Sequence, residues 1–581
     1  LAARDALDVA PTFDYAYSRA PHYPTTITDG RNLPVARNEY DDDGRLVMSI
    51  DADGERIEFT HDISARFERV KDRRGKTTVY TYDDEGRVLT ETNALNQTIT
   101  RSYDADGNVL TERDPLMRTR TMTYDQRGNQ LTEQDPLENV TTSTFDSRNA
   151  LLTQVDALNR PVITNVYNSV SGALTRTEDA LGHATVLGYD FGVGAGTQTG
   201  ELKSITDALG RETLYGLDAA GRGWRVSETD AAGTVTRYTH DSMGRVRTET
   251  RPRTHADGSV VDEVTSTTYD AKGRVRRVDH PDGSFSTTEY NAIDKPEREC
   301  DALSRCTETT YTRRGEVDRV EYADGTFEQT TYDPNGNTLT QRDRGGRVTR
   351  MVYDKANRLI ETIYPDPDDP DGDDGNPANN PRTRSEYDAA GQLHYSFDEL
   401  GHRTEYRYDD AGRQTRVIDA LGHTTTTTYD DGGQRETVTD AEGRVTRFFY
   451  DGAGRLTDTI HPDETPAVDT DNLRTVVEFD DAGQKIAQID ERGRVQRFAY
   501  DTLGRLERVV LPDPETGANP PLVAGQSPAG SGTLTTRYVY DQRGNKTQQI
   551  DALGRITRFE YDSMGRQSAR QLPLGQRESM G

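Results

Sequence analysis

Short segments that alternate hydrophobic and polar residues recur along the whole chain, separated by turns rich in aspartate and glycine. Segments 88–92 and 98–103 are typical, because threonine, valine, isoleucine and tyrosine dominate them and an Asp/Gly turn bounds them. This composition predicts strand–turn–strand units. No long window places apolar residues at i, i+3, i+4 and i+7, which is the spacing of a helix. The chain is therefore predicted to be all-β.

A tyrosine–aspartate pair opens one turn in each unit and usually recurs after 21 residues. Fixed self-similarity at such a period predicts one small unit stacked many times. We identify about 23 units, and we call the turn that starts at this aspartate the YD turn. The residues that define the repeat are exemplified by Tyr82, Asp83, Gly86, Tyr103, Asp104, Gly107, Tyr408, Asp409 and Gly412.

The fifth position of the repeat is usually glycine, and Asn149 and Asn357 replace it in two units. Both residue types tolerate positive φ, so we expect a left-handed residue in a tight turn. Another turn lies midway in each unit and reads DALGR at Asp207 and Asp551. We call it the second turn. Each unit is thus predicted to be two short antiparallel strands.

The number of strands predicts a wound sheet. About 46 strands at roughly 4.8 Å each would span on the order of 220 Å if laid flat. A twisted sheet of that length should curl or wind. We therefore predict tandem two-stranded units that form a long spiralling antiparallel β-sheet, and the low hydrophobic content of the chain also fits a hollow interior. The repeated tyrosine rings would stack as a ladder, with each hydroxyl reaching a polar partner.

The predicted organisation is a lead-in of strands at 1–34, a repeat region at 35–570 and a truncated next repeat at 571–581. Long intervals rich in proline, glycine and aspartate predict surface loops between strands. These loop insertions lie near 251–263, 365–381, 461–472 and 512–532.

Composition narrows the class of protein. Hydrophobic residues make up only 32% and the net charge is −29, a combination that is also typical of disorder. The periodic aromatic and β-branched residues favour a thin, ordered sheet instead. The acidic excess disfavours nucleic acid as a partner. No apolar stretch approaches 18 residues, so no membrane span is predicted. The chain starts without a signal-peptide pattern, and we interpret it as an internal piece of a longer polypeptide.

Few residues are candidates for chemistry. Cys300 and Cys306 flank one second turn, where they are either a disulfide or two reduced thiols. An acidic loop is interpreted first as a solvated loop, and its oxygen ligands could also bind calcium. The candidate ligands are Asp366, Asp368, Asp371 and Asp373. No other cofactor is predicted, and the hydrolase, zinc-protease and phosphate-loop motifs are absent from the sequence, so no catalytic residue is assigned.

The YDxxGR motif, followed by a DALGR-type turn at a 21-residue period, resembles the YD repeat of the rearrangement-hotspot (Rhs) proteins. Insecticidal toxin C components and teneurins carry similar repeats. The resemblance implies a spiralling β-shell that, in bacterial members, encloses a toxic C-terminal domain released by autoproteolysis. Such cores usually end in a DPxGL-type segment with the cleavage aspartates. Asp114, Asp135 and Asp333 begin DP segments that do not match it, so no protease residue is carried over.

From this resemblance we expect a non-enzymatic, structural shell segment of a secreted or surface-exposed polymorphic toxin. Its partner would be a C-terminal toxin or plug domain of the same polypeptide, lying outside this chain. The alternative is an extracellular adhesion or carbohydrate-binding module. In that case loops 365–380 and 512–532 would contact a cell-surface glycan or protein.

Overall fold

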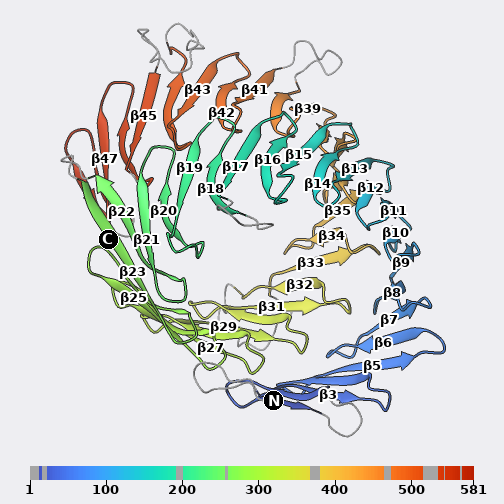
Figure 1. Cartoon of the computed structure of the whole chain (residues 1–581). Helices are drawn as coiled ribbons and strands as arrows, with labels where there is room; N and C mark the ends of the chain where they lie inside the picture. Colours follow the sequence, from blue (N-terminus) through green and yellow to red (C-terminus); the bar gives the residue numbers. More distant parts are fainter. Residues whose placement is uncertain are drawn as a thin grey trace. The chain divides into compact units, whose positions relative to one another are not determined.

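The computed structural model describes residues 12–15, 23–190, 200–254, 260–366, 380–462, 473–514, 534–541, 543–562 and 566–580. Every regular element in these ranges is a β-strand, and there are 49 of them (Figure 1). The prediction of an all-β chain is confirmed. The strands divide between two compact units, each composed of separate stretches of sequence, so the predicted region 35–570 contributes to both.

Unit 1 is built from the described residues of Leu1–Glu138, Thr268–Val278 and Ser284–Thr424. Its strands form an early run and a late run, within which consecutive strands pair antiparallel. The early run is β1 (Thr12–Tyr15), β2 (Pro24–Thr28), β3 (Pro34–Tyr40), β4 (Leu46–Asp51), β5 (Arg56–Asp62), β6 (Phe67–Lys71), β7 (Thr77–Tyr82), β8 (Val88–Thr92), β9 (Thr98–Tyr103), β10 (Val109–Arg113), β11 (Thr119–Tyr124) and β12 (Gln130–Gln134). The late run is β25 (Phe285–Tyr290), β26 (Pro296–Cys300), β27 (Cys306–Tyr311), β28 (Val317–Glu321), β29 (Phe327–Tyr332), β30 (Thr338–Arg342), β31 (Val348–Tyr353), β32 (Leu359–Ile363), β33 (Arg382–Tyr387), β34 (Leu393–Phe397), β35 (Arg403–Tyr408) and β36 (Gln414–Ile418).

Unit 2 is built from the described residues of Asn139–Thr267, Asp279–Gly283 and Thr425–Gly581, and β24 (Val275–Asp279) contributes to both units. It has the same two-run arrangement. The early run is β13 (Val140–Phe145), β14 (Leu151–Val155), β15 (Pro161–Tyr167), β16 (Leu174–Asp179), β17 (Ala184–Asp190), β18 (Glu201–Thr206), β19 (Glu212–Leu217), β20 (Arg225–Thr229), β21 (Val235–His240), β22 (Val246–Thr254) and β23 (Val260–Tyr269). The late run is β37 (Thr424–Tyr429), β38 (Arg435–Thr439), β39 (Val445–Tyr450), β40 (Leu456–Ile460), β41 (Arg474–Phe479), β42 (Lys485–Ile489), β43 (Val495–Tyr500), β44 (Leu506–Leu511), β45 (Leu534–Tyr540), β46 (Lys546–Ile550), β47 (Ile556–Tyr561), β48 (Gln567–Gln571) and β49 (Arg577–Ser579).

The aspartate that opens a YD turn also holds it closed. The backbone N–H of Asp83 donates to the carbonyl of Arg87 at 3.0 Å, and Gly86 N–H donates to the carbonyl of Asp83 at 3.2 Å. The Asp83 carboxylate accepts hydrogen bonds from the amides of Glu85 and Arg87 and from the guanidinium of Arg87. This pattern is that of a type I turn closed by a G1 bulge. One carboxylate thus satisfies three donors in a five-residue turn.

The fifth position is left-handed, as predicted. Gly86 has a φ of 82°, Asn149 of 65° and Asn357 of 62°. The second turn has the same chemistry, because the Asp207 carboxylate accepts hydrogen bonds from the amide of Leu209 and from the amide and guanidinium of Arg211. Both ends of the strands are therefore closed by the same device.

Many YD tyrosines tie their repeat to the preceding one. The hydroxyl of Tyr103 donates to the carbonyl of Val88 at 2.8 Å, and that of Tyr408 donates to the carbonyl of Leu393 at 2.8 Å. Both contacts span 15 residues. The same contact joins Tyr290 to Val275, Tyr311 to Pro296, Tyr332 to Val317, Tyr450 to Arg435, Tyr500 to Lys485 and Tyr561 to Lys546. The predicted polar partner of the tyrosine is thus a backbone carbonyl.

The predicted ladder of directly stacked rings is wrong at several positions of the repeat, because an arginine side chain lies over the ring. The Arg87 guanidinium lies 5.2 Å from the ring centroid of Tyr103, and that of Arg274 lies 4.3 Å from the ring centroid of Tyr290. The final residue of one YD turn reaches the ring of the next unit, where a cation over the aromatic face is favourable. The same arrangement pairs Arg358 with Tyr387, Arg455 with Phe479 and Arg505 with Tyr540.

The predicted loop near 251–263 is described only at its two ends. Residues 251–254 and 260–263 belong to β22 and β23 and pair there, with Arg251 opposite Glu263 and Thr254 opposite Val260. Residues 255–259 lie outside the described residues. The insertions near 365–381, 461–472 and 512–532 lie mostly outside the described residues.

The core is thin. In the described part of the chain no large side chain is fully buried, and most strand residues are half-buried. The buried hydrophobic side chains are Ala52, Met122, Ala173, Ala487, Val495, Val510 and Ala569. Order therefore depends on strand pairing, turn closure and polar contacts more than on a packed apolar interior.

Candidate functional site

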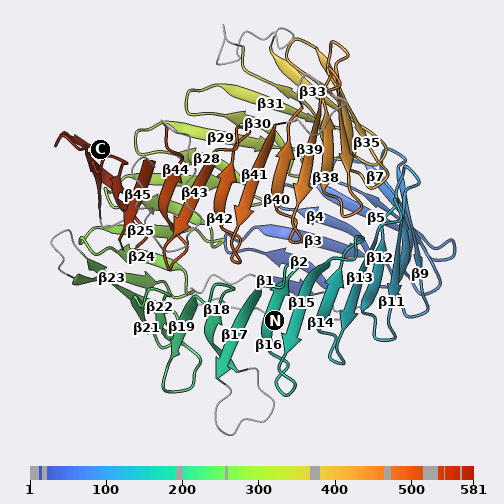
Figure 2. The same cartoon turned by 90° about the horizontal axis from the view of Figure 1, so that it is seen from above.

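Within each unit, second turns of the early run contact YD turns of the late run. In unit 1, Arg118 Nη1 donates to Gln392 Oε1 at 2.9 Å and to the carbonyl of Asp409 at 3.3 Å. In unit 2, Arg160 donates to Gln434 at 3.0 Å. Figure 2 shows these two runs of unit 2, with strands of the early run in teal and strands of the late run in orange. We call these turn-to-turn contacts the run contact.

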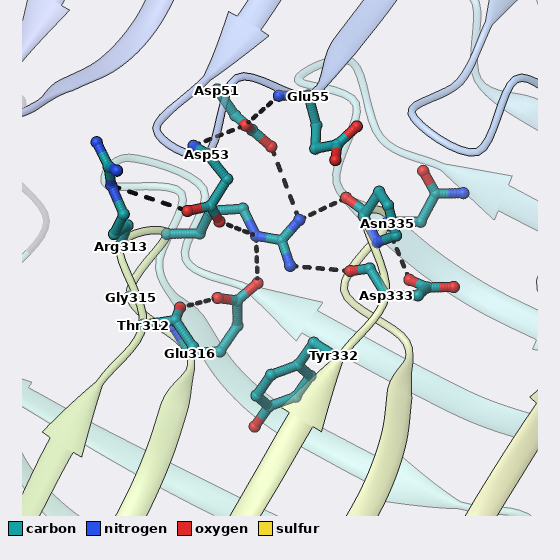
Figure 3. Close-up of polar contacts among 12 residues, drawn as sticks. Asp51, Asp53, Glu55, Thr312, Arg313, Gly315, Glu316, Tyr332, Asp333 and Asn335 are labelled. Carbon is teal, nitrogen blue, oxygen red and sulfur yellow. Dashed lines mark hydrogen bonds and ion pairs between the residues drawn. The ribbon is translucent and has the colours of Figure 1, made fainter.

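The run contact of unit 1 contains a partly buried ionic cluster (Figure 3). The side chain of Asp51 is 7% exposed, and its Oδ1 accepts hydrogen bonds from the amides of Asp53 and Glu55 at 3.0 Å. Its Oδ2 lies 2.9 Å from Arg73 Nε, an ion pair that lacks hydrogen-bond geometry. The early run thus presents a carboxylate that is closed off from solvent.

Arg314 of the late run completes this cluster. Its guanidinium lies 3.7 Å from Asp51, 3.5 Å from Asp53 and 2.9 Å from Glu316. It also donates to the carbonyls of Asp333 and Pro334. A guanidinium with five donors can serve several acceptors in one plane, which suits a residue shared between two runs.

Arg74 makes a reciprocal contact from the early run. It donates to the carbonyls of Tyr353 and Asp354 at 3.1 and 3.0 Å and to the side-chain oxygen of Asn357 at 2.9 Å. Its Nε lies 3.4 Å from Asp333, whose side chain is 7% exposed. Charges on the two runs therefore pair in both directions.

The electrostatics of the turns favour ionised aspartates. The amide of Arg45 lowers the pKa of Asp41, and the Arg494 guanidinium lowers the pKa of Asp490. Burial, followed by the negative charge of Glu68, raises the pKa of Tyr82 to about 12. These shifts follow the repeat, whereas an acid–base site would single out one pair of groups.

The geometry therefore supports binding of the chain to itself. In the described ranges no group of three or more His, Cys, Asp and Glu side chains is placed to hold a metal ion. Of the predicted calcium ligands Asp366 is described, and Asp368, Asp371 and Asp373 lie outside the described residues. The calcium loop stays a prediction.

The two cysteines lie directly opposite each other on β26 and β27, and the structure joins Cys300 to Cys306 with their Cα atoms 4.0 Å apart. Formation of this bridge in solution stays a prediction. A polar hollow of about 680 Å³ lies beside it, lined among others by Glu299, Tyr322 and Arg344.

The repeat-defining residues have structural roles. Tyr103 and Tyr408 bind backbone carbonyls, Asp83 and Asp104 close turns, and Gly86 is left-handed. Asp409 closes its turn as well, and Gly107 and Gly412 are also left-handed. The glutamines of the run contact were not predicted from the sequence; they are Gln392, Gln434 and Gln484. Their signal was present, because they replace the arginine that usually ends a YD turn.

Comparison with known proteins finds two family models. The teneurin YD-shell model matches residues 293–506, and the RHS-repeat model matches residues 103–140, 223–260 and 540–577. No curated protein matches the chain. These matches cover the same tyrosine–aspartate turns that build the two runs.

Two solved structures are similar to the chain over most of its length. The crystal structure of TcdB2-TccC3-TEV is 14% identical with a TM-score of 0.47, covering 93% of this chain and 31% of that chain. The structure of the Photorhabdus luminescens Tc holotoxin pore is 14% identical with a TM-score of 0.46, covering 97% of this chain and 32% of that chain. The chain thus spans about a third of the length of these proteins.

Proposed function

Since the chain is a YD-repeat protein with teneurin YD-shell and RHS-repeat sequence, we propose that it is a structural shell segment of an Rhs-like polymorphic toxin. In this proposal it encloses an effector domain that is not part of the chain. The role is structural and non-enzymatic, and the partner is a C-terminal toxin or plug domain of the same polypeptide. The assembly is secreted or displayed at a cell surface.

One observation carries this proposal: in both units the chain returns after more than 270 residues and binds its own earlier turns. A sheet in which one run binds the turns of its neighbouring run makes a continuous wall, because the second turns of the early run and the YD turns of the late run then cover each other. The polar, thin character of the described sheet supports a wall in preference to a solid rod. Within the described ranges, no helix could serve as a membrane span.

The test is cryo-electron microscopy of the full polypeptide that contains this chain. Weak, poorly ordered density enclosed by the sheet supports a shell with cargo. A sheet that encloses nothing, with ordered loops facing outward, would overturn the proposal in favour of the adhesion or glycan-binding module. The loops that the adhesion hypothesis depends on, 365–380 and 512–532, lie mostly outside the described residues.

A second measurement separates the two functions. Limited proteolysis should leave an enclosed effector intact while the effector alone, expressed separately, is degraded. Equal digestion of the enclosed and the separate effector would argue against enclosure. A glycan array with the same sample then reports directly on the adhesion hypothesis.

A further inference from the structure

Three YD turns of the described chain end in glutamine, and all three glutamines accept a hydrogen bond from an arginine of the neighbouring run. The pairs are Arg118 with Gln392, Arg160 with Gln434 and Arg211 with Gln484. Their distances are 2.9, 3.0 and 3.0 Å, and their separations along the chain are 274, 274 and 273 residues. One pair lies in unit 1 and two lie in unit 2. The same substitution therefore coincides with the same contact in both units.

The chemistry explains why the usual arginine is absent at these positions. In an ordinary YD turn the final arginine bonds its own aspartate and the next turn, as Arg87 does with Asp83 and the carbonyl of Asp104. An arginine has donors only. A second arginine arriving from the neighbouring run would therefore find only backbone acceptors there, such as the Asp409 carbonyl that Arg118 reaches, and its side chain would meet a like charge.

Glutamine keeps the link along its own run and adds an acceptor for the other run. Gln392 Nε2 donates to the carbonyl of Gly412 at 2.9 Å, and Gln484 Nε2 donates to that of Gly504 at 2.7 Å. This replaces the contact to the next turn that arginine makes elsewhere. The side-chain oxygen remains available to the incoming guanidinium, and all three glutamines are half-buried.

The incoming arginines are held in place before they reach the glutamine. Arg160 Nε donates to Asp156 at 2.8 Å and Arg118 Nε donates to Asp114 at 2.6 Å, which leaves Nη1 directed at the neighbouring run. A guanidinium fixed at one end loses little conformational freedom when the other end binds. The pair is thus preorganised on both sides.

We propose that these arginine–glutamine pairs set the register of the winding, so that the glutamine of each of these three YD turns is matched by the arginine of one second turn. Register is the property that strand pairing alone leaves open here, because neighbouring units have nearly the same sequence. A shift by one unit would place Arg160 opposite a turn that ends in arginine, Arg413 or Arg455, in place of Gln434. The pairs therefore identify one register out of several similar ones. This inference goes beyond the proposed function and does not depend on any cargo.

The test is a swap of one pair. Gln434→Arg should separate the two runs locally, and amide hydrogen exchange in turns 156–160 and 430–434 should become about tenfold faster. The swapped double variant Arg160→Gln with Gln434→Arg restores one donor and one acceptor, so exchange should return to within about twofold of the unmodified protein. Recovery by a reversed pair is a result that general damage to the turn cannot produce.

Asn108→Arg is the matched control. It introduces the usual arginine at the end of a YD turn in which Asn108 donates to Asp104. Among the described residues, this turn faces no arginine of another run. Its exchange should not change. Unchanged exchange in Gln434→Arg, or failure of the double variant to recover, would overturn the proposal. If Gln434→Arg does not fold, Gln434→Glu provides the second measurement, because a carboxylate should slow exchange at neutral pH and lose that effect in acid.

Discussion

The second turns of the early and late runs have the same internal chemistry and very different surroundings. We call turns 114–118, 156–160 and 207–211 the covered edge, because each contacts the neighbouring run. We call turns 301–305, 343–347, 440–444, 490–494 and 551–555 the bare edge. The final arginines of the covered edge are 12 to 27% exposed, and those of the bare edge are 54 to 62% exposed.

The bonds inside the turn do not explain this difference. Arg160 Nε lies 2.8 Å from Asp156 on the covered edge, and Arg444 Nε lies 2.6 Å from Asp440 on the bare edge. The turn therefore forms without help from another run, and the run contact adds burial and hydrogen bonds to a device that is already complete. Matched substitutions on the two edges should separate the stability of a turn from the stability of the winding.

The largest difference is expected for an aspartate of the ionic cluster. Asp51→Ala removes both the turn closure and a nearly buried partner of Arg73 and Arg314, and it should lower the free energy of unfolding by about 3 kcal/mol. Asp343→Ala is the bare-edge control in the same unit and removes turn closure only. Chemical denaturation measures both. Equal losses would mean that the cluster adds nothing to the turn.

The disulfide should have the next largest effect. It spans turn 301–305 of the bare edge. A covalent bond stabilises this turn, whereas contacts with the neighbouring run stabilise the turns of the covered edge. Reduction, or the pair Cys300→Ser with Cys306→Ser, should lower the free energy of unfolding by about 2 kcal/mol. The serine variant should show no response to reductant. A midpoint that does not change when the unmodified protein is reduced would refute a bridge in solution.

A smaller effect is expected for the leucine of the second turn. Leu158 is 37% exposed and lies against Gly432 of the neighbouring run, whereas Leu553 at the same position of the bare edge is 75% exposed. Leu158→Ala should cost about 1 kcal/mol, and Leu553→Ala should leave the midpoint of unfolding unchanged. If both variants behave alike, the apolar part of the run contact does not contribute to stability.

The smallest effect is expected for the dependence of stability on alkaline pH through Tyr82. It should not differ between the covered edge and the bare edge. The pKa of Tyr82 is raised from 10.0 to about 12 by burial and by Glu68, so its neutral form is favoured in the folded state. Its contribution is complete below pH 10 and is lost as the pH rises from 10 toward 12. Thermal midpoints measured across this window should fall less steeply for Tyr82→Phe. An equal slope in both proteins would show that this phenol does not link stability to pH.

The repeat could be predicted from sequence because its causes are local. A left-handed residue at Gly86, a closing carboxylate at Asp83 and a strand of β-branched residues depend on neighbours within one unit. The ring ladder was wrong because the reach of the Arg87 side chain decides what lies beside Tyr103. The pairing of residues 251–254 with 260–263 was not predicted, because the length of the interval was weighed more heavily than its strand pattern.

The run contact could not be predicted in the same way, because it depends on the twist summed over many strands. Arg118 and Gln392 are separated by 274 residues, a length that covers many repeats. No single repeat determines it. The replacement of arginine by glutamine was nevertheless visible in the sequence. The distance in sequence between a second turn that ends in arginine and a YD turn that ends in glutamine therefore offers an estimate of the number of residues in one winding.

The thin core has a consequence for how the protein responds to temperature. Unfolding usually raises the heat capacity by about 12–15 cal/mol/K per residue, and newly exposed apolar surface is responsible for that increase. In this chain the described buried hydrophobic side chains are mostly alanine and valine, so unfolding exposes little such surface. The increase per residue should therefore fall below the usual range. The stability curve becomes broad and flat, and a wall of this kind resists cold as well as it resists moderate heat.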